Sequence, residues 1–339
     1  MDKKQSRLQF EFVRELGSGR NVAQFPQSAN VCPSDEPLSR APEQDKAGGL
    51  HRWRRRMLLS AGLLWTCLGF SQTPHTLLWQ ISGNGLKKPS YLFGTMHILC
   101  TDDAHLSDSL RAAIARVDEV YFEIDISDKW GMLGAMKYMR MNDSKKLSDL
   151  LTPKEYERVK AYFNQHAAML PFGMLERFKP MLISSLIETA GMDCQTTDGM
   201  ELMIMKELRT YDKPVNGLET VEFQAGLFDS IPYEQQAKEL VNYVDSSEEY
   251  AKMTRDLAEV YKAQDLDKID SLSRQGDPSM NGHMDLLLYD RNRKWAKMLN
   301  GLLPQKSLLV AVGAAHLPGE NGVIDLLRKQ GYTLTPVKN

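Results

Sequence analysis

Hydrophobic residues along the chain fall into short continuous runs near both ends and into helically spaced runs between them. The short runs are typical of buried strands and occupy residues 77–81, 90–94, 120–126, 213–218, 307–312 and 332–337. From about residue 152 to 300, most apolar positions recur every three or four residues, which predicts helices. We therefore expect an α/β (α+β) fold, with a central sheet built from N- and C-terminal strands and a large helical middle section packed on it.

Capping residues indicate where several helices begin. Ser107 precedes a helically spaced run, and Thr220 stands before another. Thr152 is followed by Pro153 and Glu155, which combines an N-cap, a proline at the first helical position and a capping-box glutamate. Further helices are expected over 234–245, 247–263, 266–274, 284–299 and 321–330.

Two short motifs follow predicted strands at opposite ends of the domain. Gly94 and His97 form one Gly-x-x-His motif, and Gly313 and His316 form the other. A glycine at this place lets the chain turn sharply or approach a neighbour closely. Each histidine would then stand at the rim of the sheet. If the two strands are neighbours, both imidazoles can contribute to one metal site.

The two motifs, in this order and with their flanking residues, resemble the TraB/GumN family, which includes the Tiki-type proteases. The resemblance covers roughly residues 77–337. It rests on these segments: 89–97, 120–125, 197–202, 214–220 with Gln224, and 312–332. One residue departs from the family pattern, because Glu201 stands where the family more often has Asp.

The resemblance implies a metal-dependent hydrolase, and it suggests a role for each polar residue. His97, His316 and Glu123 would bind a divalent ion, with Zn, Mn or Co as the candidates. Glu123 is also a candidate general base, and Glu201 is a second choice for either role. Arg291 would neutralise charge on a tetrahedral intermediate.

Other residues of the motifs are expected to contact the substrate. They are Gly94, Thr95, Gly313 and Glu219, and Glu219 is also a second choice as ligand or base.

Each assignment has a simpler alternative. A histidine near a strand end often only bonds neighbouring backbone, and Glu123 could point to solvent by strand alternation. Glu201 could face water from its helix, Glu219 could cap the following helix, and Arg291 could pair with acidic neighbours at the surface.

Composition limits the classes of function. The chain has 339 residues, 42% of them hydrophobic, which suffices for one large domain with a sizeable core. Its formal net charge of −2 shows no basic excess, so no nucleic-acid partner is expected.

The first residues differ from the rest. Residues 1–50 lack sustained periodicity and are expected to be disordered, as an extension that is not part of the native protein. Residues 51–73 combine a basic start, an apolar stretch and a small-residue exit, which is typical of a signal peptide. We expect an exported protein, periplasmic, envelope-associated or secreted, whose mature domain (74–339) has no membrane span. Within it, Cys100 and Cys194 would either pair in an oxidising compartment or remain as buried thiols.

The functional hypothesis is an exported metal-dependent hydrolase, specifically a peptidase acting on peptides or proteins. The alternative is a non-catalytic envelope protein of the same fold that binds a peptide, a metal or haem through the same histidines. A third alternative is a structural envelope protein whose histidines only brace the sheet.

Overall fold

The structure is a computed structural model that describes residues 75–339, apart from 167–170, 189–191, 193, 195 and 276–281. The expected N-terminal extension (1–50) and signal peptide (51–73) lie outside the described residues.

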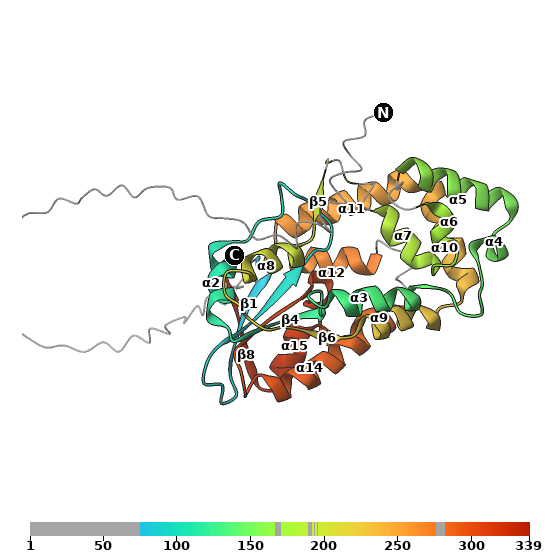
Figure 1. The fold of residues 1–339 in the computed structure, drawn as a ribbon. Coiled ribbons are helices and arrows are strands. Elements are labelled where there is room, and N and C mark those ends of the chain that lie inside the picture. The colour runs from blue at the N-terminus through green and yellow to red at the C-terminus, as the bar shows by residue number, and fades with distance from the viewer. Residues whose placement is uncertain (1–74, 167–170, 189–191, 193, 195, 276–281) are drawn as a thin grey trace, which may run out of the picture. The chain divides into compact units, whose positions relative to one another are not determined.

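Six strands form one mixed sheet in the order β6-β4-β7-β2-β1-β8 (Figure 1). Strands β6, β4, β7 and β2 are parallel, whereas β1 pairs antiparallel with β2 and with β8. The bounds are β1 Leu78–Gly83, β2 Ser90–Thr95, β4 Glu119–Ile124, β6 Val215–Glu219, β7 Leu308–Gly313 and β8 Tyr332–Val337. The expected sheet of N- and C-terminal strands is confirmed.

The register of the central strands places the two Gly-x-x-His motifs side by side. In the β2–β7 pair, Gly94 lies opposite Val312 and Thr95 lies opposite Gly313. Strand β4 pairs with the other side of β7, and β6 follows β4. Because the carboxyl ends of parallel strands meet at one edge of a sheet, the residues that follow these four strands lie at the same edge.

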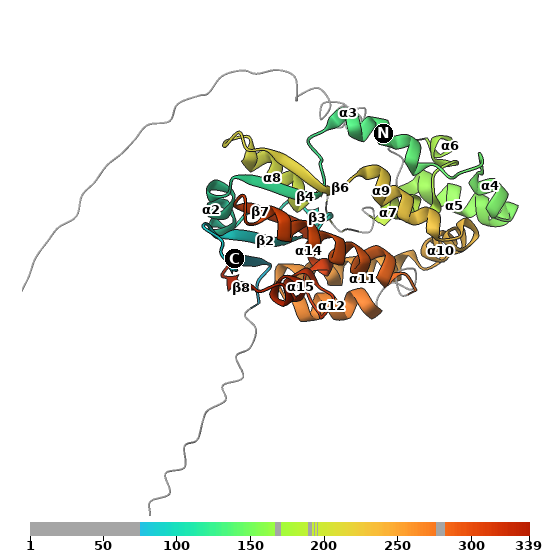
Figure 2. The same ribbon diagram turned by 90° about the horizontal axis from the view of Figure 1, so that it is seen from below.

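Helices cover both faces of the sheet (Figure 2). On one face, α2, α8, α11 and α12 pack on a core that includes Phe93, Phe122 and Ala311. On the other face, α14 and α15 pack on Leu92, Val310 and their neighbours. These helices are α2 Asp108–Arg116, α8 Met200–Leu208, α11 Ser247–Lys262, α12 Leu266–Gln275, α14 Asp290–Leu302 and α15 Val323–Lys329. The apolar residues of β7 are buried because both faces are covered.

A third apolar core lies among the middle helices, which Figure 1 shows grouped to one side of the sheet. They are α4 Leu147–Leu150, α5 Pro153–His166, α6 Phe172–Leu175, α7 Pro180–Glu188 and α10 Tyr233–Asp245. Shorter elements connect this group to the sheet: α3 Lys129–Ala135, η2 Met136–Met139, α9 Val221–Leu227 and η4 Phe228–Ser230. The helical middle section is confirmed. No helix in the described part of the chain has the length and apolarity needed to cross a membrane.

The predicted capping residues act as expected. The Ser107 hydroxyl accepts the Leu110 amide at 3.0 Å, and the Thr220 hydroxyl accepts the Phe223 amide at 3.1 Å. At the start of α5 the Glu155 carboxylate accepts the Thr152 amide at 2.8 Å, which completes the capping box.

The helix expected over 284–299 has a different form at its start. Residues Asp285–Tyr289 form a π-helical turn (η5), and α14 begins at Asp290. The Leu287 carbonyl in this turn accepts a hydrogen bond from Arg291 Nη1 at 2.8 Å. A widened turn of this kind exposes a carbonyl to a side chain, and here that side chain belongs to the candidate site.

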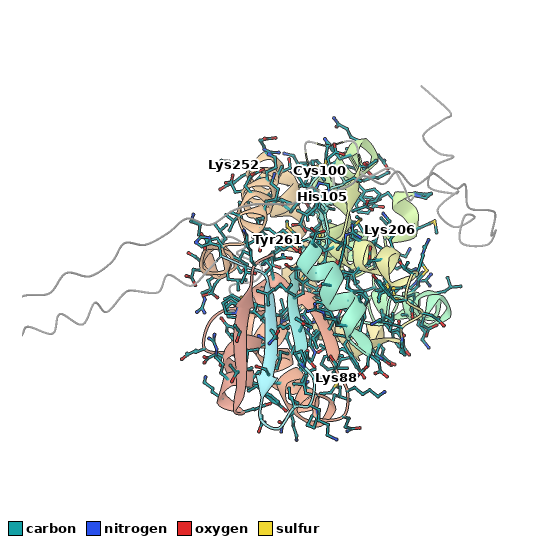
Figure 3. All side chains as sticks on the ribbon, turned by 90° about the vertical axis from the view of Figure 1, so that its left-hand side faces the viewer. Lys88, Cys100, His105, Lys206, Lys252 and Tyr261 are labelled. Carbon is teal, nitrogen blue, oxygen red and sulfur yellow. A yellow bond between two sulfur atoms is a disulfide. The ribbon has the colours of Figure 1, made fainter. Side chains whose placement is uncertain are left out.

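A separate two-stranded ladder lies beyond the end of β2. Strand β3 (Leu99–Cys100) pairs antiparallel with β5 (Thr197–Asp198). A disulfide joins Cys100 to Cys194, so the alternative of two free thiols is excluded in this structure. Figure 3 shows Cys100 near the end of the sheet where Tyr261 lies, with Lys88 at the opposite end.

Candidate functional site

His316 is a buried histidine with a defined orientation. It ends the short helix η6 (Ala314–His316) that directly follows β7, and its exposed fraction is 4%. Its Nδ1 lies 2.6 Å from Asn292 Oδ1, while the Asn292 amide group donates to the carbonyls of His316 and Asn321. Because the Asn292 nitrogen is used as a donor, Nδ1–H of His316 donates to Oδ1. This tautomer leaves Nε2 with a lone pair.

His97 has an equivalent partner on its Nδ1. It lies on the loop between β2 and β3, and Nδ1 is 2.7 Å from Oε1 of Glu201 in the first turn of α8. The His97 side chain is 65% exposed and that of Glu201 is 14% exposed. A carboxylate on Nδ1 fixes the ring and leaves Nε2 as the available nitrogen, which is a common arrangement around metal-binding histidines.

The two histidines have pKa values shifted in opposite directions. The hydrogen bond to Glu201 raises the pKa of His97 to about 9. Burial lowers the pKa of His316 to about 3, although nearby Glu123 opposes this shift. At pH 7 without a metal, His97 is therefore protonated and His316 is neutral.

Arg291 connects two glutamates that end neighbouring strands. Its Nη2 lies 2.5 Å from Glu123 Oε2, and its Nε donates to Glu219 Oε2 at 3.0 Å. Gln224, in α9, donates to both of these carboxylate oxygens at 3.1 and 3.3 Å. Nη1 of Arg291 is also 3.3 Å from Nε2 of His316. The guanidinium is buried, so the expected alternative of a surface pair is excluded for Arg291.

Glu123 points into this group and not to solvent. Its Oε1 accepts the Gly313 amide at 2.9 Å and lies 3.7 Å from His316 Nε2. Burial would raise the pKa of Glu123, but nearby positive charge and the Gly313 amide lower it to about 2. The positive charge comes first from His316, which is itself protonated at the low pH where Glu123 titrates, and then from Arg291 and His97. A carboxylate that stays ionised to such low pH is a good cation ligand and a weak proton acceptor.

The glycines of both motifs permit close packing at the site. A Cβ on Gly94 would lie 3.1 Å from Ala314 Cα, and one on Gly313 would lie 3.2 Å from Glu123 Oε1. Gly313 has an ordinary negative φ of −49°, and Gly94 is not among the residues with positive φ. The glycines therefore serve close approach and not a sharp turn. Thr95, which follows Gly94 in the first motif, has a buried side chain.

The structure brings the predicted site residues to one edge of the sheet. His97, His316, Glu123 and Arg291 lie close enough for their charges to shift the pKa values of His97, His316 and Glu123. Glu201 lies behind His97, and Glu219 contacts Arg291 while Thr220 caps the next helix. The assignment of Gly94, Thr95, Gly313 and Glu219 to substrate contact stays a prediction.

Sequence reasoning gave no role to four neighbours of these residues. Asn292 orients His316, Gln224 joins the two glutamates, and the Trp295 ring lies 4.4 Å from the His316 ring. Tyr261, at the end of the sheet in Figure 3, donates its hydroxyl to the Gly94 carbonyl at 2.8 Å. Gln224 was part of the family resemblance but was given no role, and the sequence signal for Asn292 was that it adjoins Arg291.

The chemistry of this group fits a divalent cation. Three carboxylates, of Glu123, Glu201 and Glu219, stand against the single guanidinium of Arg291, which leaves two negative charges. Oε1 of Glu219 is buried without a hydrogen-bond partner in the described structure. A divalent ion that displaced the proton of His97 would balance these two negative charges.

The possible donor atoms are not gathered into a finished cluster. Across the described residues, no three His, Cys, Asp or Glu side chains form a group that could hold a metal ion. Arg291 instead contacts both Oε2 of Glu123 and Nε2 of His316.

Comparison with known proteins gives a consistent family. The chain is 25% identical over 312 residues to "Metalloprotease TIKI2" of Danio rerio, covering 76% of this chain and 60% of that protein. It is 24% identical over 313 residues to "Metalloprotease TIKI1" of Homo sapiens, covering 76% and 61%. The chain thus spans about three fifths of the length of these curated relatives. No solved structure matches it. The TraB/PrgY/gumN family profile matches residues 77–336, and the chain belongs to this family.

Proposed function

We propose that this protein is a metal-dependent peptidase that acts outside the cytoplasm. The observation that carries the proposal is the pairing of two histidines at one sheet edge, each with an oxygen partner on Nδ1. Glu201 holds His97 and Asn292 holds His316 through Nδ1, so Nε2 is the nitrogen that each ring could offer to a ligand. On His316 such a ligand would displace the Arg291 Nη1 contact. The relatives named as metalloproteases support the same class of function.

His97, His316 and Glu123 would hold the ion, with Zn, Mn or Co as candidates. A bound divalent ion supplies Lewis acidity, which polarises a carbonyl and lowers the pKa of water. The low pKa of Glu123 favours the role of ligand over that of general base.

The remaining residues position this group. Arg291 and Gln224 hold the Glu123 carboxylate from one side, and the Gly313 amide holds it from the other. Since the guanidinium already contacts two carboxylates, its role in stabilising a tetrahedral intermediate stays a prediction. Glu201 keeps the His97 ring oriented.

The location outside the cytoplasm is part of the proposal. It is supported by the signal-like segment at 51–73 and by the Cys100–Cys194 disulfide, because disulfides persist mainly in oxidising compartments.

The test is hydrolysis of a fluorescence-quenched peptide library by the purified protein. We expect no hydrolysis after chelation, recovery with Zn²⁺, Mn²⁺ or Co²⁺, and no recovery in His316→Ala. His166→Ala is the matched control, because this histidine is exposed and its contacts with the Tyr162 carbonyl and ring lie within α5. Hydrolysis retained by a verified metal-free sample would reject the proposal. Metal binding without hydrolysis would favour the non-catalytic alternative.

A further inference from the structure

His97 lies on an exposed loop and depends on one neighbouring segment for its orientation. Its side chain is 65% exposed, in contrast to the buried His316. Nδ1 of His97 contacts Glu201, which stands three residues after the end of β5. The position of the ring therefore depends on how the loop between β2 and β3 is held against the start of α8.

The connection between these two segments is a short ladder. Leu99 pairs with Asp198 and Cys100 pairs with Thr197, and this ladder is separate from the six-stranded sheet. The Thr101 amide extends it by donating to the Thr196 carbonyl at 3.0 Å. A two-stranded ladder is marginally stable by itself, and this one has only two pairs.

The segments approach closely around the His97–Glu201 contact. The Met200 amide donates to the Met96 carbonyl at 3.0 Å. A Cβ on Gly199 would lie 2.8 Å from the His97 carbonyl oxygen and 3.1 Å from Glu201 Oε2. A small separation of the two segments would therefore break the contact.

We propose that the Cys100–Cys194 disulfide is a positioning element of the candidate site, which holds the β3–β5 ladder closed and thereby keeps His97 against Glu201. Cys100 is three residues after His97, and Cys194 precedes β5 in the segment that leads to Glu201. The bond joins residues separated by 94 positions, so it removes much of the freedom that the two segments would otherwise have. The metal-related part of this inference rests on the proposed function, whereas the positioning part does not.

The positioning part is tested by amide hydrogen exchange in the variant Cys100→Ala/Cys194→Ala. Both cysteines are replaced so that no lone thiol can bind a metal, and no reductant is needed. We expect exchange at the Thr101 and Met200 amides to accelerate at least about tenfold, because opening of the ladder becomes easier. Amides of β2 and β7 should stay protected. Unchanged exchange at Thr101 and Met200 would overturn the proposal, and so would loss of the whole fold.

The metal-related part is tested by the affinity for Mn²⁺, Co²⁺ and Zn²⁺ in a double-mutant cycle. We expect the cysteine variant to lose about 10- to 100-fold in affinity, as for other residues that orient metal-binding histidines. Glu201→Gln should give a comparable loss, and the combination should lose little more, since both changes act through the His97 contact. Losses that add up independently would overturn the proposal.

A control separates positioning from general stability. Val159→Ala shortens a buried side chain in the core of the middle helices, a different core from the one that contains Leu99 of the β3–β5 ladder. It should lower the melting temperature without changing the metal affinity. If the wild-type protein binds none of the three ions, the proposed function fails, and hydrogen exchange alone decides the positioning role of the disulfide.

Discussion

Replacing Arg291 by methionine removes the one guanidinium that balances Glu123 and Glu219. The side chains of Arg291, Glu123 and Glu219 are 9%, 13% and 6% exposed, so water cannot compensate for the lost charge. Methionine fills a similar volume and brings no charge. The two carboxylates would then remain buried with Gln224 as their shared donor.

The expected loss of stability follows from the burial of this ion pair. Removing one partner of a buried ion pair typically destabilises a protein by about 3–5 kcal/mol. The pKa of Glu123 is lowered from 4.5 to about 2, and Arg291 contributes to this lowering together with His316, His97 and the Gly313 amide. Because this pKa is lowered in the folded state, the contribution is present above pH 4.5 and is lost as the pH falls toward 2. The difference between wild type and Arg291→Met should therefore shrink over the same range.

Urea unfolding in the presence of a chelator measures this difference in free energy of unfolding. Arg293→Met is the matched control, because Arg293 is 47% exposed and pairs with Asp290 at the surface, so its loss should stay below about 1 kcal/mol. Arg291→Met/Glu219→Gln should recover part of the stability by removing one unpaired charge. A loss in Arg291→Met no larger than in Arg293→Met would refute the reasoning.

Three further predictions follow from the site. A metal must displace the proton that His97 holds up to about pH 9, so the apparent metal affinity should rise about tenfold per pH unit from pH 6 and level off near pH 9. Competition with a chromophoric chelator measures this pH profile, and a flat profile would contradict the prediction. Asn292→Ala removes the oxygen that accepts Nδ1–H of His316, and calorimetric titration should show that the metal affinity becomes about 10- to 100-fold weaker. An unchanged affinity would exclude the orienting role of Asn292. Gly94→Ala would push against the backbone of Ala314 and should destabilise the protein by about 1–3 kcal/mol in urea unfolding, whereas Gly226→Ala, with open space at its Cβ position, should not destabilise it; equal effects would argue against close approach.

The sequence predicted the sheet well because its strands carry strong local signals. The apolar run at 308–312 is buried on both faces, and the two Gly-x-x-His motifs follow strands that are direct neighbours. Glu123, near the carboxyl end of the neighbouring strand β4, was also predicted as a site residue. This prediction was possible because the carboxyl ends of parallel strands share one edge.

What the sequence could not supply was the partner of each side chain. Asn292 and Gln224 come from helices, and their roles arise only when those helices pack beside the strand ends. Glu201 was a candidate ligand or base, whereas the structure places it on Nδ1 of His97. Neither Gly94 nor Gly313 adopts a positive φ, and both instead allow close packing against residues from other elements. The local sequence could not show these contacts.

The central claim is that His97 and His316 hold one divalent ion together. Its most direct measurement is the metal content of the purified protein after equilibrium dialysis against Zn²⁺, Mn²⁺ or Co²⁺, compared with His97→Ala and His316→Ala. We expect one tightly bound ion per chain in the wild type and a large loss in each variant. An unchanged content of one ion per chain in both variants, or no bound ion in the wild type, would contradict the claim.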